Sequence, residues 1–120
     1  MMDRQWKLND DSMHPIPRVH AYDTVLTLGG GGAYLGMVIA APLDASTRSL
    51  SRLQEKQRFY LDSFYSEYGR KEWGTPKDGK MKIYASVHPE SSEEAFEMLN
   101  TFGREARDRG VEVVIMKSVP

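Results

Sequence analysis

Two runs of apolar and β-branched residues open the patterned part of the chain. Residues 24–28 (TVLTL) and residues 34–41 (YLGMVIAA) have the length and composition of strands. The second run is almost continuously apolar, which suits a central strand better than an edge strand. The four glycines between them, Gly29 to Gly32, predict a flexible hairpin loop. We therefore expect the two strands to pair antiparallel.

After Pro42 the apolar spacing changes from that of a strand to that of a helix. Asp44, Ser46 or Thr47 can cap a first helix, and Gly69 is its expected stop. The predicted buried stripe comprises Leu50, Leu53, Gln57, Leu61, Phe64 and Tyr68. Charged residues are predicted to cover most of the other side, namely Arg48, Arg52, Glu55, Lys56, Arg58, Asp62 and Glu67.

The C-terminal part of the chain alternates strand, helix and strand. Residues 81–87 show the strict apolar alternation of a strand. Ser91 and Glu94 form a capping box for a second helix, which Gly110 ends before a last strand over residues 111–119. A unit of this kind makes its two strands parallel. We therefore predict an α+β two-layer sandwich of ββαβαβ order, with a mixed four-stranded sheet and both helices on one face.

Composition indicates how the chain divides into domains and in which cellular compartment it works. Residues 1–18 are polar and lack a sustained period, so we expect a flexible arm that contributes little to stability, followed by a single domain over residues 19–120. The absence of cysteine excludes disulfides and thiolate metal sites. The start lacks the apolar stretch of a signal peptide, and the apolar run at 33–43 is too short to span a bilayer. We expect a cytoplasmic protein.

Several short segments between residues 23 and 118 carry a resemblance through their order. They are Asp23-Thr24-Val25, Pro42-Leu43-Asp44, Leu53-Gln54-Glu55-Lys56 with Tyr60-Leu61, His88-Pro89, Ser92-Glu93-Glu94-Ala95 and Gly110. In this order the chain resembles a family of small uncharacterised bacterial α/β domains, although the glycine loop and the preceding arm depart from the family pattern. The resemblance implies the fold and no particular activity.

One candidate binding site lies where the third strand meets the second helix. His88 ends that strand, and ligands favour the carboxyl ends of parallel strands in α/β sheets. Ser91 and Ser92 begin the next helix, where free amides can bind an anion. Three nearby carboxylates, those of Glu90, Glu93 and Glu94, would repel such an anion. A small-molecule (anion) binding protein or enzyme that uses these residues is therefore an alternative hypothesis.

Other features indicate no catalytic constellation. The glycines precede a strand and no GK[ST] follows them, so they do not form a phosphate loop. The three histidines lack metal-ligand spacing, and the adjacent carboxylate pairs do not face each other. Basic residues surround Trp73, but acidic residues dilute them and the net charge is −1. We expect no cofactor, no metal, and neither a nucleic-acid nor a membrane partner.

The main functional inference concerns the sheet face away from the helices. If Leu35, Ile83 and Val113 face the core, the opposite face carries Tyr34, Val38, Tyr84, Ser86, Val114 and Met116. An open face should be mostly polar, so this apolar content indicates a contact surface. A second copy of the chain, Trp6 and Ile16 of the arm, or an unidentified protein could cover it. We favour the second copy, because two-fold dimers are the commonest oligomers, and predict a non-enzymatic interaction or accessory domain that forms a homodimer.

Overall fold

The computed structural model describes residues 10–75 and 80–118. Its elements in chain order are β1 (Thr24–Thr27), β2 (Ala33–Ile39), α1 (Thr47–Ser63), α2 (Glu67–Trp73), β3 (Met81–Val87), α3 (Glu93–Asp108) and β4 (Glu112–Lys117). The four strands, the start of α1 and the whole of α3 were predicted within a few residues of these bounds, whereas α1 ends at Ser63, before the predicted stop at Gly69. The short helix α2 was not predicted, so the predicted ββαβαβ order with two helices is incomplete.

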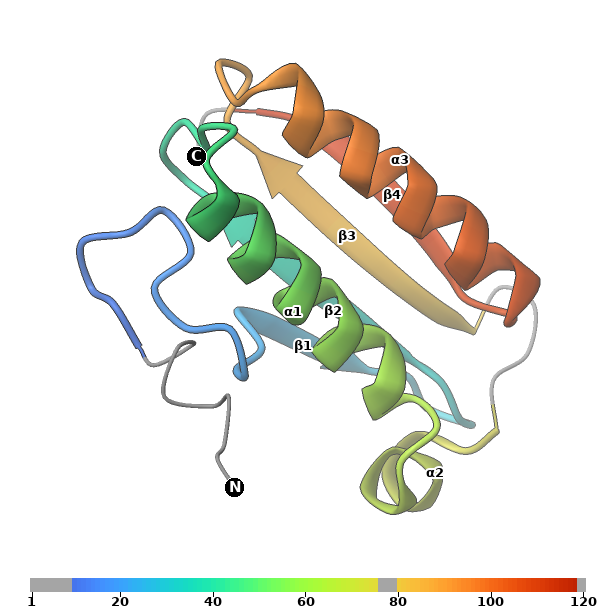
Figure 1. The fold of residues 1–120 in the computed structure, drawn as a ribbon. Coiled ribbons are helices and arrows are strands. Elements are labelled where there is room, and N and C mark those ends of the chain that lie inside the picture. The colour runs from blue at the N-terminus through green and yellow to red at the C-terminus, as the bar shows by residue number, and fades with distance from the viewer. Residues whose placement is uncertain (1–9, 76–79, 119–120) are drawn as a thin grey trace, which may run out of the picture.

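The four strands form one mixed sheet in the order β1-β2-β3-β4. β1 and β2 pair antiparallel, whereas β2 with β3 and β3 with β4 pair parallel. These directions confirm the predicted hairpin and the predicted parallel unit. Figure 1 shows α1 and α3 side by side across one face of this sheet, in contact with each other. The molecule is thus an α+β domain built on a mixed sheet.

Alternating burial along the two central strands locates the core. Every second residue of β2 and β3 is buried, from Ala33 to Ile39 and from Met81 to Val87. The helices bury the facing residues Leu53, Tyr60, Leu61, Phe64, Ala95, Leu99, Phe102 and Ala106. On the edge strand β4, Val113 and Ile115 are partly buried against the same cluster. The predicted alternation of buried and less buried residues along these strands is therefore confirmed.

The long first helix of the prediction is interrupted after Ser63. At this point the Ser66 side chain replaces backbone hydrogen-bond partners. Its Oγ donates to the Ser63 carbonyl at 2.7 Å and accepts from the Gly69 amide at 3.0 Å. Gly69 therefore lies inside α2 and is not a helix stop. A Cβ at Gly69 would meet the Ser63 carbonyl oxygen at 1.9 Å, so the close turn between the helices requires glycine. Tyr68 leaves the buried stripe and is exposed.

The N-cap of α3 lies one residue after the predicted one, and with Ala95 at the third helical position the predicted capping box does not form. Ser92, and not Ser91, is the N-cap, because its Oγ accepts from the Ala95 amide at 3.1 Å. Ser91 is instead buried, and its hydroxyl accepts from the Leu43 amide at 3.0 Å. The spacing to Glu94 favoured Ser91, but a tertiary contact with the β2–α1 loop uses that side chain.

The four glycines form the connection of the β1–β2 hairpin, as predicted. Gly30, Gly31 and Gly32 all have φ between 90° and 109°, a region that side chains with a Cβ rarely adopt. The Gly32 amide donates to the Trp73 carbonyl at 2.6 Å, which ties the loop to the end of α2. This hydrogen bond gives the loop a structural role.

Residues 10–22 lie along α1 on the side away from α3 (Figure 1). Ile16 and Val19 are fully buried and belong to the core cluster. The arm was expected over residues 1–18, of which 1–9 lie outside the described residues. Within residues 10–18, Ile16 is therefore packed in the core, while Asp10, Ser12, Met13, Pro17 and Arg18 are exposed. The physical reason lies in buried polar side chains of α1, which supply hydrogen bonds that this segment cannot make by itself.

Candidate functional site

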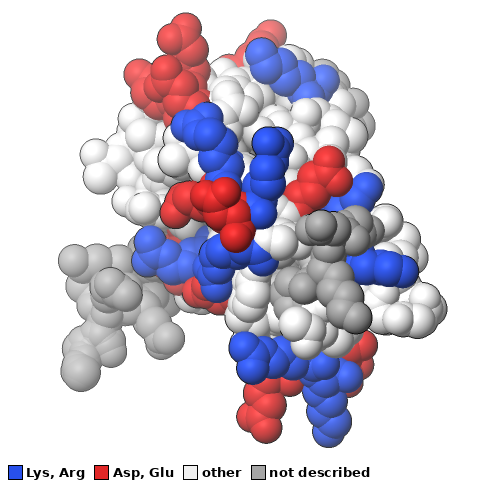
Figure 2. Space-filling view, turned by 90° about the vertical axis from the view of Figure 1, so that its right-hand side faces the viewer, with Lys and Arg blue, Asp and Glu red and all other residues white. Residues whose placement is uncertain are grey.

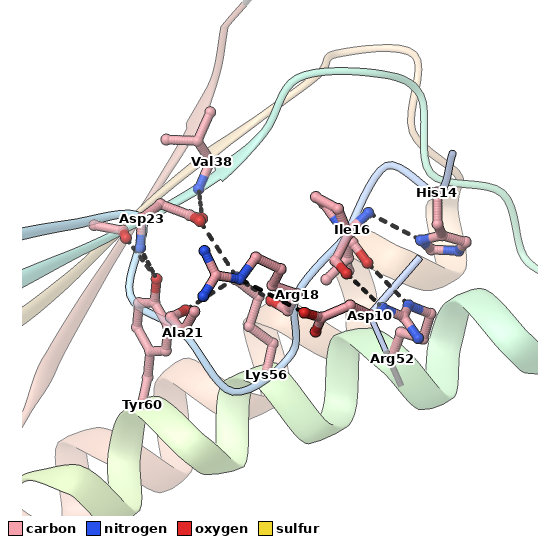
Figure 3. Close-up of polar contacts among 12 residues, drawn as sticks. Asp10, His14, Ile16, Arg18, Ala21, Asp23, Val38, Arg52, Lys56 and Tyr60 are labelled. Carbon is pink, nitrogen blue, oxygen red and sulfur yellow. Dashed lines mark hydrogen bonds and ion pairs between the residues drawn. The ribbon is translucent and has the colours of Figure 1, made fainter. Parts of the chain in front are cut away.

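Arg52 on α1 anchors the first part of the N-terminal segment (Figure 3). Its Nε donates to the Ile16 carbonyl at 2.9 Å and its Nη2 donates to the Pro17 carbonyl at 3.1 Å. Beside it, His14 Nδ1 accepts from the Ile16 amide at 2.9 Å, and Nε2 lies 2.9 Å from Ser49 Oγ. Partial burial, followed by the charge of Arg52, lowers the pKa of His14 below its ordinary value.

Lys56, one helical turn later, anchors the rest of the segment. Its Nζ donates to the carbonyls of Arg18 and Ala21 at 2.7 and 3.2 Å and lies 3.4 Å from Asp23 Oδ1. Tyr60 accepts from the Asp23 amide at 2.8 Å and donates to a β2 carbonyl at 2.7 Å. Burial lowers the pKa of Lys56, although Asp23 opposes this shift, and burial raises the pKa of Tyr60.

These buried polar residues hold structure and are not arranged for reaction. A lysine with a lowered pKa can act as a nucleophile, but only 2% of the Lys56 side chain is exposed and three oxygen atoms surround its ammonium. Helical spacing predicted Arg52 and Lys56 on the solvent side of the helix, and this prediction is wrong because both are buried. Helical spacing alone could not show that an N-terminal segment covers that side.

At the predicted ligand site at the end of β3, several polar groups make internal hydrogen bonds. His88 Nδ1 accepts from the Glu90 amide at 3.1 Å. The hydroxyl groups of Ser91 and Ser92 accept from the amides of Leu43 and Ala95. The Ser92 amide donates to the Leu43 carbonyl at 2.8 Å, so it is not free for an anion. The two bonds to Leu43 link the β2–α1 and β3–α3 loops and give Ser91 and Ser92 structural roles, whereas the His88 bond is local to its own loop.

The predicted interface residues lie together on one surface, which we call the open sheet face. Cross-strand register aligns Tyr34 with Lys82 and Glu112, and aligns Tyr84 with Val114. The open sheet face comprises Thr24, Leu26, Tyr34, Gly36, Val38, Lys82, Tyr84, Ser86, Glu112, Val114 and Met116. Of these, Thr24, Leu26, Gly36, Lys82 and Glu112 were not named in the prediction, although the register includes them. Leu26 is 57% exposed and Met116 is 41% exposed.

Aromatic and charged contacts organise the open sheet face. The rings of Tyr34 and Tyr84 meet edge to face with centroids 5.7 Å apart. Lys82 Nζ lies 5.4 Å from the centroid of the Tyr34 ring and 3.4 Å from Glu112 Oε1. The hydrogen bond to Glu112 raises the pKa of Lys82 above its ordinary value. The face therefore combines an apolar centre with one ion pair of net charge zero.

A groove of about 550 Å³ lies between α1 and α3, and the sequence analysis did not predict it. Its floor is formed by Gln57, Leu61, Met98 and Phe102, and charged side chains form its rim. Gln57 is 5% exposed, and its Oε1 is buried without a hydrogen-bond partner. A polar residue at a position of the apolar stripe was the signal that could have indicated this groove.

The basic residues near Trp73 do not form a surface of one charge. Trp73 itself is buried and packs against the ring of Phe64 at a centroid distance of 5.6 Å. On the side of the molecule shown in Figure 2, lysine and arginine side chains alternate with acidic ones. The basic residues near Trp73 in the sequence are Arg70, Lys71, Lys77, Lys80 and Lys82, of which Lys77 lies outside the described residues. On the side shown, charges of both signs are therefore mixed.

Within residues 10–75 and 80–118, the structure brings together no cluster of histidine and carboxylate side chains that could hold a metal ion. Over the same residues, each helix is too short or too polar to cross a membrane. Comparisons with known proteins gave no match to this chain among protein-family models, curated proteins or solved structures. The resemblance described from the sequence therefore stays an expectation, and the function has to be inferred from the geometry.

Proposed function

We propose that this protein is a small non-enzymatic interaction domain that forms a homodimer through the open sheet face. The observation that carries the proposal is the apolar centre of that face, where two tyrosine rings, Val38 and Val114 adjoin the exposed Leu26 and Met116. Sheets with one face in water usually carry polar residues there. A contiguous apolar patch indicates a contact surface.

The charges on the open sheet face fit a second copy of the chain. In a two-fold interface the same surface meets itself, so any excess of one charge repels. Lys82 and Glu112 balance each other and lie in the same cross-strand row. A two-fold axis parallel to the strands, between β3 and β4, can therefore place Lys82 of each copy opposite Glu112 of the other, with the apolar rows stacked beside these ion pairs.

The size of the face sets the strength that we expect. The sheet has four strands, and its central strands have seven residues each. At about 4.8 Å between strands and about 3.3 Å per residue, the face covers roughly 440 Å² in projection. Each partner buries about 800 Å² in a standard interface. Even with the relief of the side chains, this surface is small, so we expect an affinity in the micromolar range.

Other covers of the face have less support. Ile16 was a candidate, but it is buried beside α1 on the helical side of the sheet. Trp6 lies outside the described residues. A foreign protein would not require the balance of charges described above. The absence of cysteine fits the expected cytoplasmic setting, which belongs to this proposal.

Sedimentation equilibrium at micromolar concentrations tests the proposal. The wild-type chain should show a concentration-dependent mass between monomer and dimer. Met116→Glu places a charge on the open sheet face at a position that is already 41% exposed, so it should give a monomer without unfolding. Met13→Glu is the matched control, because Met13 is 90% exposed and lies outside the face.

The comparison of the two methionine variants separates a specific interface from general hydrophobic association. The proposal requires that Met13→Glu keeps the wild-type association. A wild-type chain that stays monomeric up to the highest micromolar concentrations would refute the homodimer. Equal weakening by both variants would show that the contact does not involve the open sheet face.

A further inference from the structure

The groove between α1 and α3 contains a buried polar atom that the fold does not use. Gln57 is 5% exposed, and its Oε1 is buried without a hydrogen-bond partner. Buried acceptors are almost always bonded, so an exception calls for a physical reason. Gln57 also lines the groove, and the torsion of its terminal amide is soft. A small rotation can therefore present this acceptor to a donor that enters the groove.

The charges around the groove favour a cation. The charged residues of the lining are Arg58, Asp62, Glu94, Glu97, Glu105 and Arg109, which give four negative and two positive groups. Arg109 is already engaged, since it lies 3.8 Å from Asp62 and stacks 4.2 Å from the centroid of the Tyr65 ring. With Arg109 and Asp62 paired, the rim still carries one positive group, Arg58, and three negative groups, Glu94, Glu97 and Glu105.

The floor of the groove is suited to an apolar body. Leu61 and Phe102 are buried, and Met98 lies partly buried beside them. Methionine adapts its shape to different apolar groups. The volume of about 550 Å³ lies within the usual range for small-molecule sites. Apolar walls with a few polar groups are the usual composition of such sites.

We propose that this groove binds a small organic cation, namely a protonated amine with an aryl or alkyl body. The ammonium group donates a hydrogen bond to Gln57 Oε1 and is attracted by the rim carboxylates, and the body lies on Leu61, Met98 and Phe102. An acceptor at the floor requires a donor in the ligand. The excess of carboxylates at the rim selects a positive donor over a neutral one. The inference goes beyond the proposed homodimer and does not depend on it.

A titration followed by NMR amide shifts tests the inference on the full chain. The probes are 2-phenylethylamine and its neutral analogue 2-phenylethanol. We expect the amine to shift amides of α1 and α3 around the groove at millimolar concentration, and the alcohol to shift them far less. Binding of the amine should weaken as salt is added.

Two variants and one control assign the contacts. Gln57→Leu removes the acceptor and keeps the volume, so it should weaken amine binding about tenfold, the usual worth of a hydrogen bond to a charged group. It should also raise the urea midpoint of the free protein, because an unpartnered buried oxygen is removed. Glu97→Gln should weaken binding through the rim charge. Glu93→Gln is the control, because Glu93 lies on the same helix but outside the groove lining.

Three results would overturn the inference: shifts that are absent or lie away from the groove, equal binding of amine and alcohol, and unchanged amine binding by Gln57→Leu. If Gln57→Leu does not fold, the comparison of Glu97→Gln with Glu93→Gln decides in its place, and equal binding by these two variants refutes the role of the rim charge.

Discussion

Replacing Lys56 by methionine removes a buried ammonium group and retains most of the apolar stem. In the folded protein this ammonium donates to the carbonyls of Arg18 and Ala21 and lies beside Asp23. Only 2% of the Lys56 side chain is exposed, whereas the Asp23 side chain is 30% exposed. The variant therefore tests how strongly α1 holds residues 10–22.

The expected loss follows from the balance of these contacts. Removing one member of a fully buried ion pair costs about 3–5 kcal/mol, and a single hydrogen bond to a charged group contributes about 1.5–3 kcal/mol. Two facts reduce the loss here. Water can reach Asp23 and the exposed Arg18, and burial of the ammonium itself opposes folding, as the lowered pKa of Lys56 indicates. We therefore expect Lys56→Met to lose about 2–4 kcal/mol of unfolding free energy.

Urea unfolding followed by tryptophan fluorescence measures this loss. With a slope of about 2 kcal/mol per molar urea, the midpoint should fall by about 1–2 M. Arg58→Met is the matched control, because Arg58 is an exposed cation on the same helix and its removal should change stability by less than about 0.5 kcal/mol. If the two variants unfold at the same urea concentration, the N-terminal segment contributes little, as the sequence alone suggested, and the reasoning from its contacts is refuted.

Two further predictions concern a glycine and a histidine. Gly69→Ala should lose about 1–3 kcal/mol in urea unfolding, because its Cβ would meet the Ser63 carbonyl oxygen at 1.9 Å, whereas Gly29→Ala should be nearly neutral because nothing lies within 4 Å of the added atom; equal losses would contradict this. The lowered pKa of His14 means that the unfolded chain binds a proton first as the pH falls below 6.5, so stability should decline more steeply toward acid pH in the wild type than in His14→Gln. Urea midpoints between about pH 7 and about pH 5 test this sign, and parallel pH profiles would contradict it.

The spacing of apolar residues and the relative directions of the strands could be predicted from the sequence. The alternation in residues 81–87 specifies which side chains of that strand face the core, and this assignment holds. The break after Ser63 was not predictable in the same way. It depends on hydroxyl hydrogen bonds to the backbone and on a close approach at Gly69, neither of which changes the apolar spacing.

The buried polar side chains could not be predicted from the sequence. Arg52 and Lys56 occupy positions that helical spacing assigns to solvent, and only the path of residues 10–22 makes those positions buried. The choice between Ser91 and Ser92 as N-cap likewise depended on Leu43, which is distant in the sequence. Contacts between segments that are distant in the sequence do not change the spacing of apolar residues. The sequence therefore predicted the residues of the open sheet face, but it predicted neither the burial of Arg52 and Lys56 nor the groove.

The open sheet face and the groove lie on opposite sides of the sheet, because α1 and α3 together cover the other face (Figure 1). A homodimer through the open sheet face therefore leaves the groove of each copy open to solvent. Fully buried residues of β2 and β3, such as Leu35 and Ala85, fill the layer between the two surfaces. A close-packed layer couples two sites only when it has two arrangements, and residues 10–75 and 80–118 show a single one. Amine binding and self-association should then be energetically independent. The amine titration therefore tests only the groove, and sedimentation equilibrium tests only the homodimer.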